Sequence, residues 1–185
     1  MKKKFTLIEL LIVIAVIAIL IGIMMPAIGK VRASAKISSA RADIVTLTAA
    51  VKQIESTYSS FRKLTKNFDD EGYIDNASGY ALINSEDGYK AFMKELIDPK
   101  DLDASDVLFN TRKVKILDSR KHPAENSEDF YGWLDPWGSR YNIYWDNDND
   151  EKIEISGETY YKTVLVVSAG EDKTFGTDDD IMQDQ

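Results

Sequence analysis

The distribution of hydrophobic residues separates the start of this chain from the rest. Residues 5–25 are apolar or small with one charged exception, Glu9, and Pro26 closes the run. These 21 residues would extend roughly 31 Å as α-helix, which matches the hydrocarbon core of a bilayer. The pattern predicts a transmembrane helix over residues 5–26. We expect it to remain in the mature protein, because no small-residue cleavage site of the secretory type follows it.

A one-sided hydrophobic stripe follows this run. Apolar or small residues recur at alternating steps of three and four, at Ile37, Ala40, Ile44, Leu47, Val51, Ile54, Tyr58 and Phe61. This spacing predicts an amphipathic helix over residues 27–61. The stripe could form a coiled-coil seam. Packing on the chain's own sheet is favoured, because a globular region that needs a cover follows directly.

Pro26 lies within a pattern that is helical on both sides. Its ring removes the hydrogen bond to the carbonyl of Gly22, and glycine is itself a weak helix former. We therefore expect a kink or joint between Gly22 and Pro26, with a plain end of the membrane helix as the alternative.

Residues 62–185 carry mixed signals, which together predict an α+β fold. Turn chemistry over 62–84 indicates a loop region. Ser85 can cap a helix over 86–97, and a short helical turn is expected near 104–109.

The second half of this region carries the strand signals. A strand is expected near 114–117, followed by an irregular segment over 118–130. Three further strand signals cover 141–145, 152–156 and 163–167. The first two of these are spaced as an antiparallel hairpin.

The charge of the chain changes sign along its length. Residues 1–66 carry 11 Lys and Arg against 3 Asp and Glu, whereas residues 142–185 carry 3 against 12. A basic start beside an apolar run keeps the N-terminus in the cytoplasm and sends the rest across the membrane. The acidic end argues against nucleic-acid binding by the globular part. With no cysteine and one histidine, His122, disulfides and thiolate metal sites are excluded.

The N-terminal motif carries a family resemblance. The string KFTLIEL covers residues 4–10, with Glu9 at the fifth and Pro26 at the twenty-second position counted from Phe5. This resembles the class III signal and N-terminal helix of type IV pilins and type II secretion pseudopilins. The resemblance implies that a prepilin peptidase removes the basic leader 1–4 by cleaving between Lys4 and Phe5, and then methylates Phe5. That family usually has glycine at the position of Lys4.

Glu9 also fits this resemblance on physical grounds. A carboxylate inside an apolar run is costly alone and tolerable when paired. In a helical stack it could neutralise the Phe5 amine of a neighbouring subunit and fix the axial register. The alternative is a glutamate near the membrane interface, snorkelling or protonated.

The C-terminal part resembles that of the major pseudopilin of type II secretion. The string LDPWGSRY covers 134–141, and an acidic loop begins at Ser168. The resemblance implies a DPWG turn, a small antiparallel sheet and a calcium-binding loop. The oxygen-rich candidates for calcium are Ser168, Asp172, Asp178, Asp179 and Asp180. We expect one of the three adjacent aspartates to face solvent, and choose Asp178 and Asp180 alongside Asp172. The alternative is a solvated acidic tail.

A second acidic cluster lies between two strand signals. Asp146, Asp148 and Asp150 have the spacing that starts an EF-hand loop. Glu151 stands where that loop needs glycine, and Gly157 stands where it needs glutamate. A turn that uses Asp and Asn for their turn chemistry is favoured over a second metal site.

The resemblance implies a structural subunit. We expect no enzymatic activity, because the sequence offers no nucleophile elbow, phosphate loop or metal-binding histidine set. It would sit in the inner membrane as a single-pass protein with its C-terminal part in the periplasm, and polymerise for type II secretion. Expected partners are other copies, prepilin peptidase, the assembly platform, minor pseudopilins and the lipid bilayer. The alternatives are a type IV pilin for adhesion, motility or DNA uptake, and a membrane-anchored periplasmic binding domain that does not polymerise.

Overall fold

The computed structural model describes residues 6–58, 74–77, 80–83, 85–103, 107–146, 148–155 and 157–183. The leader, Lys4, Phe5, Phe61 and much of the expected 62–84 loop lie outside these residues. The chain divides into two compact units, Met1–Ser38 and Ser39–Gln185. The fold is α+β: a long N-terminal helix is followed by small antiparallel sheets.

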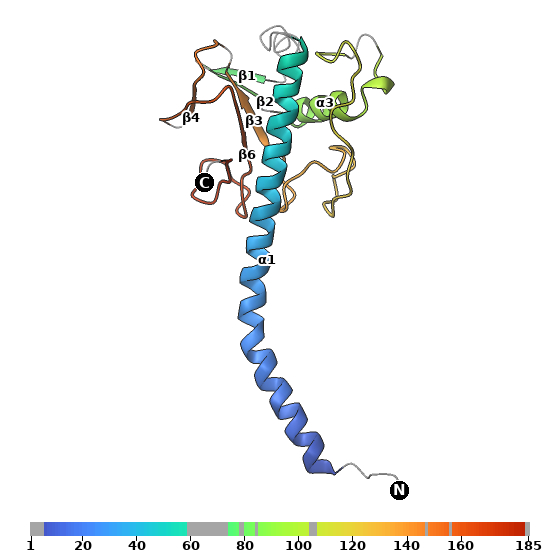
Figure 1. Cartoon of the computed structure of the whole chain (residues 1–185), viewed down its shortest axis with the longest axis vertical. Coiled ribbons are helices and arrows are strands. Elements are labelled where there is room, and N and C mark those ends of the chain that lie inside the picture. Colours follow the sequence, from blue (N-terminus) through green and yellow to red (C-terminus); the bar gives the residue numbers. More distant parts are fainter. Residues whose placement is uncertain are drawn as a thin grey trace. The chain divides into compact units, whose positions relative to one another are not determined.

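Helix α1 runs from Leu7 to Tyr58 without interruption (Figure 1). It passes through Gly22 and Pro26 as helix, so the alternative in which it ends at Pro26 is wrong. In the first unit, the large apolar side chains between Leu7 and Met25 are exposed. The first has 83% and the last 72% relative exposure. This part of α1 is long and apolar enough to cross a membrane.

In the second unit, the predicted stripe residues of α1 from Ala40 to Ile54 are buried, and Tyr58 is half-buried. Five of them have 0% relative exposure: Ala40, Ile44, Leu47, Val51 and Ile54. Packing of this stripe on the chain's own sheet is confirmed. The steps of three and four place these side chains on one face of the helix, and burying that face is the main source of its stability.

The main sheet has four antiparallel strands in the order β1-β2-β3-β6. Their bounds are β1 (Ile74–Ala77), β2 (Tyr80–Ile83), β3 (Asn142–Trp145) and β6 (Val164–Val167). The expectation of loop over 62–84 is therefore wrong at its end, where β1 and β2 form a hairpin. The signal was weak there, because the two central residues of β1 are Asp75 and Asn76, which favour turns.

The expected hairpin between 141–145 and 152–156 is also wrong. Strand β3 pairs with β6, from Asn142 with Val167 to Trp145 with Val164. Strand β4 (Ile153–Ile155) pairs instead with β5 (Glu158–Tyr160), which the sequence did not suggest. All four residues of β3 and of β6 are buried, so this pairing lies in the core. Gly157 has φ 86°, a value that two-residue hairpin turns need.

Helix α3 (Glu86–Ile97) is confirmed at both ends. The Ser85 side chain accepts a hydrogen bond from the Gly88 N–H at 3.0 Å, and a 3-10 helix, η1 (Pro99–Asp101), follows. Near its end, buried Glu95 accepts N–H bonds from Leu108, Phe109 and Asn110 at 2.6–3.0 Å. One carboxylate thus orders the connection that leaves the helix.

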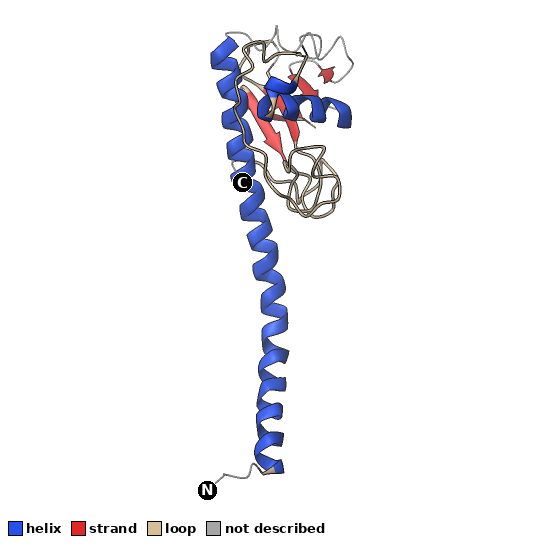
Figure 2. Ribbon diagram, turned by 90° about the vertical axis from the view of Figure 1, so that its right-hand side faces the viewer, coloured by secondary structure: helices blue, strands red, loops and turns tan. Residues whose placement is uncertain are grey.

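The segment between η1 and β3 is drawn largely as loop in Figure 2. The strand expected near 114–117 is wrong, because the N–H groups of Ile116 and Leu117 both bond to the Leu96 carbonyl instead of a strand. The irregular segment over 118–130 is confirmed. Of the helical turn expected near 104–109, the described residues 107–109 are not helical.

A partly buried ion pair connects this irregular segment to the second part of α1. The Arg120 guanidinium forms two bonds to the Asp43 carboxylate, one of them from Nη2 to Oδ2 at 2.6 Å. The Tyr141 hydroxyl donates to the same carboxylate at 2.8 Å. Arg120 also donates to the carbonyls of Gly132 and Leu134, so one arginine connects helix and loop.

Replacing Asp43 by asparagine should strongly destabilise this unit. The Arg120 guanidinium, whose side chain is 30% exposed, would lose its counter-charge. We expect a loss of about 3 kcal/mol, the low end for breaking a buried pair. Urea unfolding of the full chain in detergent, followed by tryptophan fluorescence, measures it.

The matched control is Asp118→Asn. Asp118 pairs with Lys115 at 2.7 Å, but its side chain is 90% exposed, so the change should cost no more than about 0.5 kcal/mol. Equal losses in the two variants would show that the buried network is not an anchor.

Candidate functional site

The start of α1 is built around Glu9 and Thr6. The Thr6 N–H and hydroxyl both donate to Glu9 Oε2, at 2.8 and 2.7 Å. The Glu9 N–H lies 3.4 Å from the Thr6 hydroxyl oxygen, which completes a reciprocal capping box. The sequence reasoning assigned no role to Thr6, although its T-x-x-E spacing was the available signal.

The acidic C-terminal loop closes on itself through an isolated bridge. The N–H of Ser168 bonds to the Ile181 carbonyl at 3.0 Å, and the Ile181 N–H bonds back at 2.9 Å. Gly170 has φ 65°, and a Cβ there would lie 2.3 Å from the Asp179 carbonyl oxygen. Both the backbone conformation and the close approach therefore require glycine at this position.

Ser168 connects this loop to the DPWG turn. Its buried hydroxyl donates to Asp135 Oδ2 at 2.8 Å and accepts the Gly170 N–H at 3.2 Å. The other carboxylate oxygen of Asp135 accepts the N–H groups of Trp137 and Ser139. Burial raises the pKa of Asp135, although these hydrogen bonds oppose the shift. The hydroxyl expected to help hold calcium is thus engaged with Asp135, a residue that the sequence reasoning did not select.

The aspartates of the loop point in different directions. Asp178 is exposed. Asp179 accepts the Thr177 hydroxyl at 2.7 Å and the Asp172 N–H at 3.0 Å, which lower its pKa in that order. Asp172 is exposed and bonds to the Thr174 N–H at 2.7 Å.

Asp180 is the buried member of the set, with 9% relative exposure. Its Oδ2 accepts the Gly176 N–H at 2.7 Å, whereas its Oδ1 is buried with no hydrogen-bond partner among the described residues. Burial raises the pKa of Asp180, the hydrogen bond from Gly176 lowers it, and the negative charge of Asp179 raises it. Burial has the largest effect, so the pKa is raised overall. An unpaired buried carboxylate oxygen is costly and usually marks a missing proton, cation or water.

The second acidic cluster does converge. Among the described residues, Asp146, Asp148 and Asp150 are the only group of three acidic side chains whose oxygens all lie within 4.8 Å of one another. The buried Asp146 carboxylate accepts the N–H groups of Asp148, Asn149 and Glu151 at 2.7–3.0 Å. Asn149 and Glu151 have φ 64° and 60°. These are the contacts of a tight turn, which also brings the three carboxylates together.

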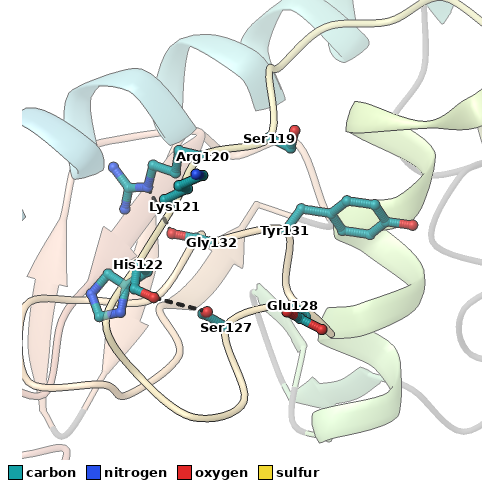
Figure 3. Close-up of a pocket in the computed structure, with 8 residues that line it drawn as sticks. All are labelled: Ser119, Arg120, Lys121, His122, Ser127, Glu128, Tyr131 and Gly132. Atoms are coloured by element: carbon teal, nitrogen blue, oxygen red, sulfur yellow. Dashed lines mark hydrogen bonds between the residues drawn. The ribbon is translucent and has the colours of Figure 1, made fainter.

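A separate cavity of about 460 Å³ lies along the irregular segment (Figure 3). Its histidine and serine do not form a nucleophile–base pair: the Ser127 hydroxyl donates to the His122 carbonyl at 3.0 Å, and His122 Nδ1 accepts the Ala124 N–H. The Tyr131 ring points towards α3 in Figure 3. Burial and the nearby Arg120 charge lower the pKa of His122.

Comparison with known proteins adds no relative. No family model, no curated protein and no solved structure matches this chain. The fold itself, a long N-terminal helix with an apolar first part and a second part packed on a small antiparallel sheet, is compatible with a pilin-like layout.

Proposed function

We propose that this chain is a structural subunit similar to the major pseudopilin of type II secretion. It is anchored in the inner membrane with its N-terminus in the cytoplasm and its C-terminal part in the periplasm, and it polymerises into a helical filament. The observation that supports this best is the continuity of α1. One helix carries exposed apolar residues at its start and a buried stripe from Ala40 to Ile54.

The exposed apolar part of α1 suits two successive environments. Lipid covers it before assembly, and the same parts of neighbouring copies cover it in the filament, so the transfer keeps apolar surface out of water. Prepilin peptidase, the assembly platform and minor pseudopilins are the partners that such a route requires.

Glu9 is the residue that gives the assembly its register in this proposal. In the membrane its charge is held locally, because Thr6 donates two hydrogen bonds to Oε2. We assign Oε1 to the Phe5 amine of a neighbouring copy, where a paired charge in an apolar stack is favourable only at one axial offset.

We further propose that calcium stabilises the C-terminal loop. Calcium takes six to eight oxygen ligands, including carbonyls and waters, and the unpaired Oδ1 of Asp180 is a buried oxygen suited to it. Asp172 and Asp178 supply further carboxylates, and Asp179 and Ser168 shape the loop around them. A bound ion would add positive charge beside a set of carboxylates that repel one another.

A type IV pilin remains the second candidate function. Such pilins often close this region with a disulfide, which a chain without cysteine cannot form. The DPWG string and the acidic loop favour the pseudopilin, and a buried 2.8 Å hydrogen bond between Ser168 and Asp135 joins these two segments.

The Glu9→Leu variant tests the polymer against a merely anchored domain. Removing the carboxylate should improve membrane insertion, by less than the roughly 2.5–3.5 kcal/mol of a charge at the helix centre because Glu9 lies near the helix start. It should abolish filaments, because the register contact is lost. Membrane fractionation and electron microscopy of sheared filaments measure the two effects. Glu9→Gln, which keeps an oxygen for Thr6 but not the charge, should also fail to assemble. Normal filaments from both variants would sink the polymer proposal.

The mature N-terminus is a second test. Mass spectrometry of the membrane-extracted protein should find a chain that begins at Phe5 with one added methyl group. Lys4→Gly should be processed faster than the natural sequence, because glycine is the usual residue before the cleaved bond. A chain that still begins at Met1 in both forms would contradict the proposed processing.

Calcium removal should lower the thermal midpoint of the full chain in detergent. Because the ion binds only the folded loop, holding it at 100 times its dissociation constant adds about 2.7 kcal/mol. Asp180→Asn should abolish this difference between calcium and chelator, whereas Glu171→Gln, an exposed acid of the same loop, should keep it. Asp148→Asn tests the other acidic cluster. If only this variant lost the difference between calcium and chelator, the calcium site would lie at residues 146–150 instead.

A further inference from the structure

A second cavity lies beside the C-terminal loop and has a different chemistry from a metal site. It measures about 590 Å³ and is lined by residues of β2 to β6 and of the loop. Four aromatic side chains line it: Tyr80, Tyr144, Tyr160 and Phe175. A cavity of this size is typical of small-molecule sites and far exceeds what a bare ion needs.

The charged residues that line the cavity are all acidic. Asp178, Asp180 and Glu158 contribute carboxylates, and the described lining residues include no Lys, Arg or His. Asp180 is the buried one, and its Oδ1 is the carboxylate oxygen that has no hydrogen-bond partner among the described residues. A positively charged hydrogen-bond donor would both pair this oxygen and balance the carboxylate charge.

The aromatic walls are held in place by the core. Tyr144 and Val167 belong to a buried cluster, against which Tyr80, Tyr160 and Phe175 pack. The Tyr80 and Tyr144 rings meet edge to face with centroids 5.5 Å apart. The Tyr160 hydroxyl is fixed by a 2.7 Å bond to Glu158. Rings that are already ordered need little rearrangement to receive a ligand.

We propose that this cavity binds an organic cation that carries N–H groups, of the alkylammonium or alkylguanidinium class. Aromatic faces attract such cations and cover their apolar stems. A charged N–H donor would complete the hydrogen bonding of Asp180 Oδ1. A metal ion would use the carboxylates but leave the aromatic walls without a role, and a quaternary ammonium would leave Oδ1 unpaired.

The proposal does not depend on polymerisation, but it shares Asp180 with the proposed calcium site. Binding is therefore measured in chelator, so that failure of one proposal does not decide the other. Isothermal titration calorimetry of the full chain in non-ionic detergent compares n-butylammonium with tetramethylammonium, which has the same charge and no N–H. We expect saturable binding of the first and at least about tenfold weaker binding of the second.

Variants test whether the cavity is responsible. Asp180→Asn should weaken n-butylammonium binding by about tenfold or more, because the charge is removed. Phe175→Leu keeps apolar bulk and removes one ring, and should weaken binding about threefold, which keeps the test valid if the Asp180 variant fails to fold. Glu171→Gln, in the same loop but outside the cavity, should bind normally.

A second titrant distinguishes a free amine from the basic side chain of another protein as the source of the cation. Lysine capped at both ends carries the same ammonium on a polypeptide backbone, as a basic side chain of another protein would. Binding of the capped lysine as tight as that of n-butylammonium identifies a protein side chain, and exclusion of it identifies a free amine. Absence of saturable n-butylammonium binding, equal binding of tetramethylammonium, or binding unchanged by both Asp180→Asn and Phe175→Leu would overturn the proposal.

Discussion

The carboxylate of Asp43 is the contact on which the globular unit depends. It lies on the buried face of α1 and receives both Arg120 and the Tyr141 hydroxyl. Arg120 in turn bonds to two backbone carbonyls and lies over the Trp133 ring, with its Cζ 4.1 Å from the centroid. A segment with little regular secondary structure is thereby fixed to the helix and to the start of β3. Apolar packing alone could not set this register, because hydrophobic contacts have no direction.

Buried carboxylates also order three other described segments. Glu95, Asp135 and Asp146 are buried, and each accepts at least two backbone N–H bonds from the residues that follow. A carboxylate can accept several bonds at once, so each one satisfies donors that would otherwise belong to a helix or strand. The acidic composition is therefore partly structural. Asp180 differs from these residues, because one of its oxygens is left over.

The unpaired oxygen of Asp180 makes the C-terminal loop suited to binding a cation. A buried carboxylate oxygen without a donor raises the free energy of the empty loop, and any cation that reaches it recovers that cost. Calcium would approach it together with the other aspartates, whereas an organic cation would approach it from the aromatic cavity. The opposite end of the chain is similar, since both hydrogen bonds from Thr6 go to one carboxylate oxygen of Glu9, Oε2.

Local sequence determined the elements whose signals are local. The apolar run, the stripe from Ala40 to Ile54 and the Ser85-capped helix α3 follow from residue spacing and capping, so they could be predicted to within a few residues. The pairing of β3 with β6, the β1–β2 hairpin and the link from Ser168 to Asp135 could not. These depend on which residues meet across long stretches of chain, and short strands carry too little pattern to specify their partners. Likewise, the sequence selected the acidic residues of the C-terminal loop, but only the tertiary structure decided that Asp178 faces solvent and Asp180 is buried, because burial is a property of the packed neighbours and not of the residue.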